Sequence, residues 1–321
     1  VLTCLLVTSC GSGSKEGASD DGASSFTLKF GHLASAKHTW HKAALKFKEL
    51  VEARSEGRVT VKVYPNSELG QEMELITSIQ LGTADMTITG ESLQTWAPKA
   101  ALLAVPYAFA SAEEMRAAAG GPVGEEIRAE ITEAAGLVPL AWFERGPRHL
   151  TSNRPITTPV DLKGLKLRVP NVPLFVKVWE ELGAKPTPMA FGEVFTSLQQ
   201  STIEAQENPL SLIESASFYE VQKHVNLTAH VRSWIYVVIG KKKLDSMPEE
   251  LSTIVLQAAK EMQIYENELF LAEEAKLRVD LEAKGMSFVD SNQAAFAEKA
   301  KAAVLKALTA EQRTLLEKLK N

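Results

Sequence analysis

An alternation of strand and helix patterns after residue 25 restricts the fold more than any other feature of the sequence. Phe26–Phe30 has the pattern of a strand, a helix is predicted from Ser35 to about Glu56, and Val59–Tyr64 is again a strand. Strand, helix and strand in this order indicate a β-α-β unit with parallel strands. The helix carries an apolar stripe at helical spacing, formed by Trp40, Ala44, Phe47 and Val51.

A second α/β series begins near Arg148. A long helix is then predicted from Pro248 to Lys284. At ~1.5 Å per residue it would span roughly 50 Å, which exceeds one small lobe. The strands expected in the second series and after it are Leu165–Val169, Ile203–Gln206, Val225–Val231 and Trp234–Ile239.

These two series predict an α/β fold with two lobes and a long helix that crosses both. We expect residues 26–147 and 234–272 in the first lobe, and residues 148–233 and 273–321 in the second. Two such lobes form a cleft between them, lined by loops at the carboxyl ends of strands. The sequence therefore predicts a ligand cleft at the junction of the lobes.

The first 25 residues differ in composition from the rest of the chain. Residues 1–9, VLTCLLVTS, are apolar and are interpreted as the remnant of a signal peptide. Val7–Cys10 resembles a bacterial lipobox, so Cys10 is predicted to carry a lipid, and residues 10–25 form a flexible tether. We expect a lipid-anchored protein in the periplasm or on the outer face of the membrane. The two cysteines of the chain, Cys4 and Cys10, precede the folded part.

The sequence also argues against several classes of function. The net charge is −5 and Lys241–Lys243 is the only basic cluster, so nucleic acid is not an expected partner. GxSxG, Walker and HExxH motifs are absent, so neither an enzyme nor a cofactor is expected. His32, His38 and His41 lack an obvious carboxylate or cysteine that would complete a zinc site, and are interpreted as pocket or surface histidines.

Arginines lie at the predicted junction of the lobes. Arg168 lies at the end of a predicted strand, one residue before a Pro-Asn turn, and Arg145 and Arg148 lie in the segment that joins the two series. A guanidinium donates two parallel hydrogen bonds to a carboxylate. Asn208 follows the strand predicted at 203–206 and could add an amide. These residues predict a cleft that binds an organic acid.

Several motifs resemble the substrate-binding proteins of tripartite ATP-independent periplasmic (TRAP) transporters, the C4-dicarboxylate-binding (DctP) family. The similarity extends over residues 27 to 295, in order and with matching spacing. It implies a periplasmic-binding-protein-like fold with hinge strands and closure around the ligand. The motifs are LKFG at 28–31, HKAALKFKELVEARSEGRVTVKVYPNSELG at 41–70, GLKLRVPN at 164–171, KPTPMAFGEVFTSLQ at 185–199, AQENP at 205–209 and FYEVQKHVNLTAH at 218–230.

The resemblance also implies roles for individual residues. Arg168 would clamp the ligand carboxylate and Arg148 would assist it, while Asn208 and Phe191 line the same pocket. Glu91 matches a position that often contacts polar groups of the ligand.

Three positions bear on the ligand class. Leu33 and Gln94 replace an asparagine and an arginine of the sialic-acid-binding branch, so sialic acid is not expected. Arg145 replaces a common asparagine and could be an additional donor. We expect Glu91, Gln94 and Asn208 to hydrogen-bond hydroxyls. His32 is also assigned to the pocket, and tryptophans, Trp234 among them, either stack on a sugar ring or pack in the core.

The expected function is that of a solute receptor for a small organic acid, most simply a sugar acid such as a uronate or aldonate. A C4-dicarboxylate is the alternative ligand. The expected partner is a TRAP membrane permease, and the protein is expected to be a monomer. A ligand sensor that reports to a membrane kinase is the alternative role, because the same pocket serves both.

Overall fold

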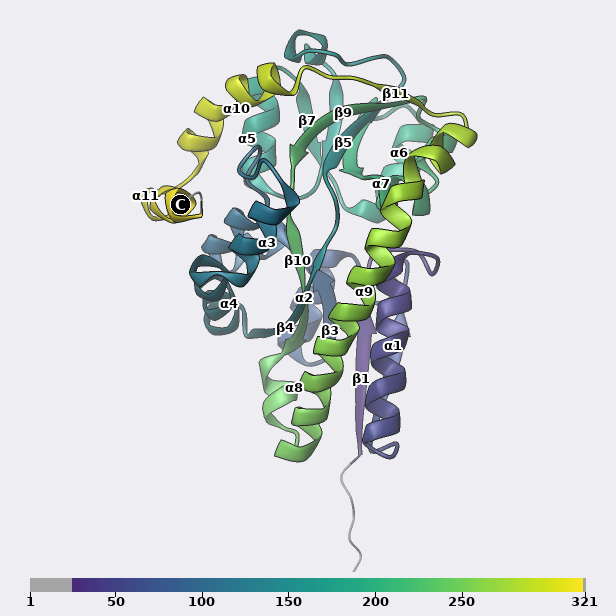
Figure 1. Ribbon diagram of the computed structural model, residues 1–321, viewed down its shortest axis with the longest axis vertical. Helices are drawn as coiled ribbons and strands as arrows, with labels where there is room; N and C mark the ends of the chain where they lie inside the picture. The colour runs from purple at the N-terminus through teal and green to yellow at the C-terminus, as the bar shows by residue number, and fades with distance from the viewer. Residues whose placement is uncertain (1–24, 320–321) are drawn as a thin grey trace, which may run out of the picture.

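The computed structural model describes residues 25–319 and contains two β-sheets at opposite ends of its long axis (Figure 1). In the first sheet β1 pairs in parallel with β2 and β3, as the β-α-β pattern predicts, and β10 returns antiparallel between β3 and β4. The strands in spatial order are β2 (Val59–Tyr64), β1 (Phe26–Gly31), β3 (Met86–Thr89), β10 (Trp234–Gly240) and β4 (Leu137–Glu144).

The second sheet has six strands and is also mixed. β6 pairs in parallel with β7 and β8, whereas β5 runs antiparallel to β8 and β9. Its order is β11 (Ser287–Val289), β9 (His224–Val231), β5 (Arg148–Ser152), β8 (Ala205–Pro209), β6 (Lys166–Val169) and β7 (Lys185–Pro188).

Helices cover both sheets (Figure 1). Those of the first lobe are α1 (Thr39–Arg54), α2 (Glu72–Leu81), η1 (Glu91–Thr95), η2 (Pro98–Ala104), α3 (Ala112–Gly120), α4 (Pro122–Ala135) and α8 (Lys241–Asp245). Those after β5 are η3 (Pro159–Leu162), α5 (Pro173–Leu182), η4 (Phe191–Glu193), α6 (Val194–Gln199), α7 (Leu210–Ser215), η5 (Phe218–Glu220), α9 (Glu249–Ala283), α10 (Gln293–Ala307) and α11 (Ala310–Lys318).

The long helix α9 has 35 residues and crosses both lobes, as predicted (Figure 1). Met262, in its first half, belongs to the apolar core beside the first sheet, together with Phe47 of α1. Leu277 and Leu281 belong to a separate core of the second lobe. No helix within residues 25–319 is both long and apolar enough to span a bilayer.

The structure corrects two predicted element boundaries. The helix expected from Ser35 begins at Thr39, because the Nδ1 atom of His38 accepts a hydrogen bond from the backbone N–H of Trp40 at 3.1 Å and caps α1. The strand expected at 203–206 is β8, which runs to Pro209, so Asn208 lies within a strand and not after one.

Within residues 25–319 the chain passes between the lobes from β4 to β5, from β9 to β10, along α9 and again from α10 to α11. Gly146 lies in the first connection with φ +70°, a conformation that favours glycine. The helix α11 packs on η2 of the first lobe, where Gln312 Nε2 donates to the carbonyl of Pro98 at 2.7 Å, although residues 273–321 were assigned to the second lobe. The lobe boundaries stay a prediction, and the signal peptide, the tether and Cys10 lie outside the described residues.

Candidate ligand-binding site

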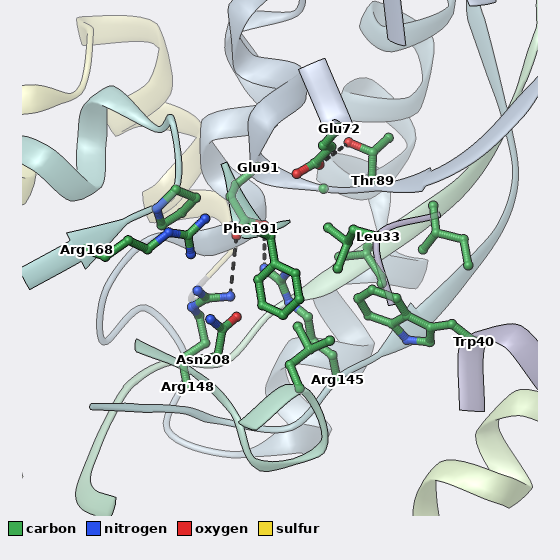
Figure 2. A pocket seen from close by; sticks show the side chains of 15 residues that line it. Leu33, Trp40, Glu72, Thr89, Glu91, Arg145, Arg148, Arg168, Phe191 and Asn208 are labelled. Carbon is green, nitrogen blue, oxygen red and sulfur yellow. Dashed lines mark hydrogen bonds and ion pairs between the residues drawn. The ribbon is translucent and has the colours of Figure 1, made fainter. Parts of the chain in front are cut away.

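A cavity lies between the two lobes, at the hinge (Figure 2). The first lobe contributes the end of β3 and the start of α1, α2 and η1, and the second lobe contributes the ends of β6 and β8. Its polar lining consists of Glu72, Thr89, Glu91, Arg145, Arg148, Arg168 and Asn208.

Arg168 lies in this cavity and is only 3 % exposed, although it follows a solvated lysine on β6. Its Nε and Nη2 atoms donate to the carbonyl of Met189 at 3.0 and 2.6 Å, and its guanidinium lies 6.0 Å from the ring centroid of Phe191. Burial, together with nearby Arg148, lowers the pKa of Arg168 to about 10 although Glu207 opposes the shift, so Arg168 is still charged at pH 7. No carboxylate within residues 25–319 forms an ion pair with it at 4 Å or less.

Arg148, in contrast, is neutralised by the protein. Its Nε and Nη2 atoms donate to the two carboxylate oxygens of Glu207 at 2.5 and 2.7 Å, and its Nη1 atom is 3.7 Å from Glu91 Oε1. Glu207 also contacts His230 Nε2 at 2.8 Å. Burial would raise the pKa of Glu207, but Arg148, helped by His230, lowers it to about 2. The fork of Arg148 that was expected to assist the ligand carboxylate is therefore occupied by Glu207.

Arg145 and Glu91 form a second buried ion pair. Arg145 Nη2 donates to Glu91 Oε2, and Arg145 Nε donates to Ser233 Oγ at 2.8 Å. Burial would raise the pKa of Glu91, but Arg145 and Arg148 outweigh it and hold this pKa below its ordinary value. Glu91 therefore binds two arginines, in addition to lining the cavity where it was expected to contact hydroxyls.

The remaining residues predicted for the site divide into two groups. Asn208 and Phe191 line the cavity, and Asn208 Nδ2 donates to Gln206 Oε1 at 2.6 Å. Gln94, His32 and Trp234 are absent from the lining.

These three side chains pack against or hydrogen-bond other parts of the protein. Gln94 Nε2 donates to the backbone carbonyl of Glu91 at 2.8 Å. His32 is 1 % exposed and its Nε2 atom lies 3.1 Å from His41 Nδ1, and burial lowers its pKa to about 3. Trp234 is completely buried beside Phe109, because β10 is a central strand and its side chains pack in the core.

The cavity lining includes Trp40, Glu72 and Thr89, which the sequence did not identify as site residues. Glu207 was also not identified; it does not line the cavity but accepts a hydrogen bond from Arg148, which does. Trp40 was assigned to the core stripe of its helix, because an apolar stripe does not distinguish a core from a cavity wall. Glu72 accepts a hydrogen bond from Thr89 Oγ1 at 2.6 Å, and burial, followed by repulsion from Glu91, raises its pKa. Glu207 directly precedes Asn208 in the QENP motif, so a strand predicted to end at Pro209 would have placed both residues at the site.

The described residues do not suggest a metal centre. Within residues 25–319, no group of three or more histidine, cysteine, aspartate or glutamate side chains is arranged to hold a metal ion. His32 and His41 contact each other directly. The polar groups of the cavity are arginines, carboxylates and an amide, which suit an oxygen-rich organic anion.

Comparison with known proteins identifies the family. Residues 30–311 match the model of bacterial extracellular solute-binding proteins, family 7 (DctP). A solute-binding protein of Roseobacter denitrificans is 56% identical over 297 residues, 92% of this chain and 91% of that protein. A crystal structure of a TRAP periplasmic solute-binding protein from this organism, with bound L-galactonate, has a TM-score of 0.91 at 55% identity and covers 93% of this chain and 99% of that one.

Two further relatives have different named ligands. The 2,3-diketo-L-gulonate-binding periplasmic protein of Escherichia coli is 36% identical over 275 residues, 85% of this chain and 84% of that protein. The C4-dicarboxylate-binding periplasmic protein DctP of Rhodobacter capsulatus is 31% identical over 258 residues, 79% of this chain and 77% of that protein. The family match and these identities show that the chain belongs to the DctP family of TRAP transporter periplasmic solute-binding proteins, which bind solutes and are not enzymes.

Proposed function

We propose that this protein binds a sugar acid with one carboxylate, of the aldonate type, and that Arg168 holds this carboxylate. The supporting observation is the charge balance of the cavity. Arg145 and Arg148 are paired with Glu91 and Glu207, which leaves Arg168 as the arginine of the lining without a carboxylate partner in the described chain. A buried charge is stable only with a counter-charge or hydrogen bonds, so one ligand carboxylate completes the site.

The rest of the proposed ligand is uncharged and hydroxylated. Asn208 and Glu72 provide an amide and a carboxyl group on the cavity surface, and these hydrogen-bond hydroxyls. The Roseobacter relative, at 55% identity, binds L-galactonate, which has one carboxylate and several hydroxyls. Closure of the lobes would bury the ion pair in a medium of lower dielectric constant, where it is stronger.

A C4-dicarboxylate is the alternative ligand, as the name of the Rhodobacter relative indicates for that protein. Its second carboxylate would enter a lining that already contains Glu72 and Glu91, without another unpaired arginine among the described residues. Like charges in one buried site repel, so we expect dicarboxylates to bind weakly.

A thermal-shift panel tests the ligand class. Ligand at 100 times its dissociation constant stabilises by about 2.7 kcal/mol, which should raise the melting temperature by roughly 5 °C for a chain of this size. We expect this shift with L-galactonate or a related aldonate or uronate, and little shift with succinate, malate and fumarate. A large shift with succinate and none with any sugar acid would reject the proposal.

We also propose that the loaded protein delivers its acid to TRAP permease subunits and does not report to a membrane kinase. Membership in the family supports this role. Two TRAP membrane subunits encoded beside the gene, and uptake of the acid that requires both, are the expected findings. A neighbouring sensor kinase together with normal uptake in a strain that lacks this protein would favour the sensor.

Anchoring through Cys10 is the remaining part of the proposal. The lipobox-like Val7–Cys10 and the tether after it support it. Acylated protein should partition into the detergent phase of a two-phase extraction, and Cys10→Ala should move it to the aqueous phase. Wild-type protein found wholly in the aqueous phase would contradict the anchor.

A further inference from the structure

The cavity is chemically divided along its length (Figure 2). Arg168 lies toward one end and Leu33 and Trp40 lie together at the other, with Phe191 between them. Trp40 is 3 % exposed, and its backbone N–H donates a hydrogen bond to His38 Nδ1. The end that faces away from Arg168 therefore presents hydrocarbon to a bound molecule.

This apolar end is a continuous wall and not a pair of isolated side chains. Four buried lining residues belong to one apolar cluster, and Leu33 packs against the same cluster. They come from different elements and from both lobes, so closure holds them together. The four are Trp40 of α1, Ile88 of β3, Leu212 of α7 and Ile235 of β10.

The polar groups nearest to this wall are already used. Thr89 Oγ1 donates to Glu72, so its proton is not available to a ligand. At Gly90 the backbone lies so close to the wall that a Cβ atom would approach Ile235 Cγ2 to 2.7 Å. A ligand hydroxyl placed against the carbon atoms of this wall would lose hydrogen bonds to water, which is unfavourable.

We infer that this wall contacts the end of the acid that is distal to its carboxylate, and that the site accepts a sugar acid whose chain ends in a methyl group. This inference rests on the proposed function, because it assumes that Arg168 holds the carboxylate. An ω-deoxy aldonate would place its methyl group on Trp40 and Leu33. An aldarate, which carries a second carboxylate at that position, would bury a charge against hydrocarbon.

A hydroxyl and a carboxylate at the distal end of the acid should weaken binding by different amounts. A hydrophobic pocket rejects an added hydroxyl by at most about a hundredfold. The 6-deoxy analogue of L-galactonate should therefore bind between equally and about a hundredfold more tightly than L-galactonate. The corresponding aldarate, galactarate, should bind at least about a hundredfold more weakly, because an unpaired buried carboxylate costs far more than a hydroxyl.

Titration calorimetry with these three acids on the full chain tests the inference. Binding of the 6-deoxy acid more than tenfold more weakly than L-galactonate would overturn it and leave the proposed function intact. If none of the three acids binds but another aldonate or a uronate does, this inference is overturned and the proposed function stands.

Variants of the wall make the test independent of one ligand pair. Leu33→Asn adds an amide of similar size at a half-buried loop position and should shift the preference toward L-galactonate, by about tenfold or more. Leu81→Asn, on the exposed end of α2 where Leu81 is 76% accessible, is the matched control and should leave the ratio unchanged. An unchanged ratio in Leu33→Asn with normal affinity for L-galactonate would overturn the inference.

Discussion

Two clusters of ionisable side chains meet at Glu144 and Arg145, and they differ in the number of arginines that contact their carboxylates. On the cavity side Glu91 and Glu207 contact Arg145 and Arg148, and the pKa of each glutamate is lowered although burial alone would raise it. Glu91, Glu207 and Glu266 are all buried, so the local number of arginines decides whether these carboxylates are charged.

Behind the hinge the balance is reversed. Glu144 lies 3.1 Å from Arg116 Nε, but Glu266 and Glu274 of α9 each have an oxygen without a hydrogen-bond partner among the described residues. Burial, together with repulsion from Glu144, raises the pKa of Glu266 to about 8 and that of Glu274 to about 7. At pH 7 Glu266 is therefore mostly protonated and uncharged, whereas on the cavity side Arg168 is charged and has no carboxylate partner among the described residues.

The largest effect is expected from breaking the paired cluster at Glu207. Glu207→Gln removes the counter-charge of Arg148 and the partner of His230, and leaves a buried cation. Loss of one partner of a buried pair costs roughly 3–5 kcal/mol. Urea unfolding should show this loss in the free energy of unfolding.

An exposed pair with the same geometry is the matched control. Arg54 donates to both oxygens of Glu261 at 2.8 Å, but the side chains are 35% and 48% exposed. Glu261→Gln should cost far less stability than Glu207→Gln because water screens this pair. Equal losses in the two variants would show that burial does not separate these two pairs.

The next effect concerns the unpaired arginine. Arg168→Lys keeps the charge but loses the planar fork, and should weaken binding of the acid by roughly 2–5 kcal/mol. Calorimetry measures this loss, and Arg278→Lys, on the exposed outer face of α9, is the control. Unchanged affinity in Arg168→Lys would remove Arg168 from the carboxylate site.

The smallest effect is the pH dependence of stability set by Glu266. Its pKa is higher in the folded than in the unfolded state, so its contribution is fully present below about pH 4.5 and is lost as pH rises through about 8. Between pH 6 and 9 the free energy of unfolding should fall by on the order of 2 kcal/mol. Glu266→Gln should flatten this slope.

The paired cluster has the opposite dependence, which separates the two regions experimentally. The pKa of Glu207 is lowered to about 2, so its contribution is present above its ordinary pKa and is lost as pH falls toward 2. Glu207→Gln should therefore reduce the loss of stability in acid and leave the slope between pH 6 and 9 intact. The same slope in wild type and Glu266→Gln would contradict the assignment of that proton.

Much of the fold followed from local patterns. The stripe from Trp40 to Val51 predicted α1, and the length of the apolar and charged pattern after Pro248 predicted that α9 crosses both lobes. These predictions succeeded because helix periodicity and length are properties of consecutive residues. The start of α1 was wrong by several residues because a histidine cap has a weaker sequence signal than serine.

The candidate site was only partly predictable. Arg168, Asn208 and Phe191 were identified from motifs, whereas Trp40 and Glu72 were not, because each lies in a helix that also packs in the core or faces a neighbour. Trp234 was assigned to the ligand as one of two options, but a central strand surrounded it with core side chains.

The sequence by itself determined which groups are available: three arginines near one junction, one of them near the end of a strand, and a long helix that joins two lobes. Only the tertiary structure decided which arginine is left without a partner. In the antiparallel register of β5 and β8, Leu150 lies opposite Glu207 and Arg148 lies opposite Pro209, so Arg148 and Glu207 are diagonal neighbours. Ion pairing depends on distances between strands that are far apart in the chain, and no local pattern encodes those distances.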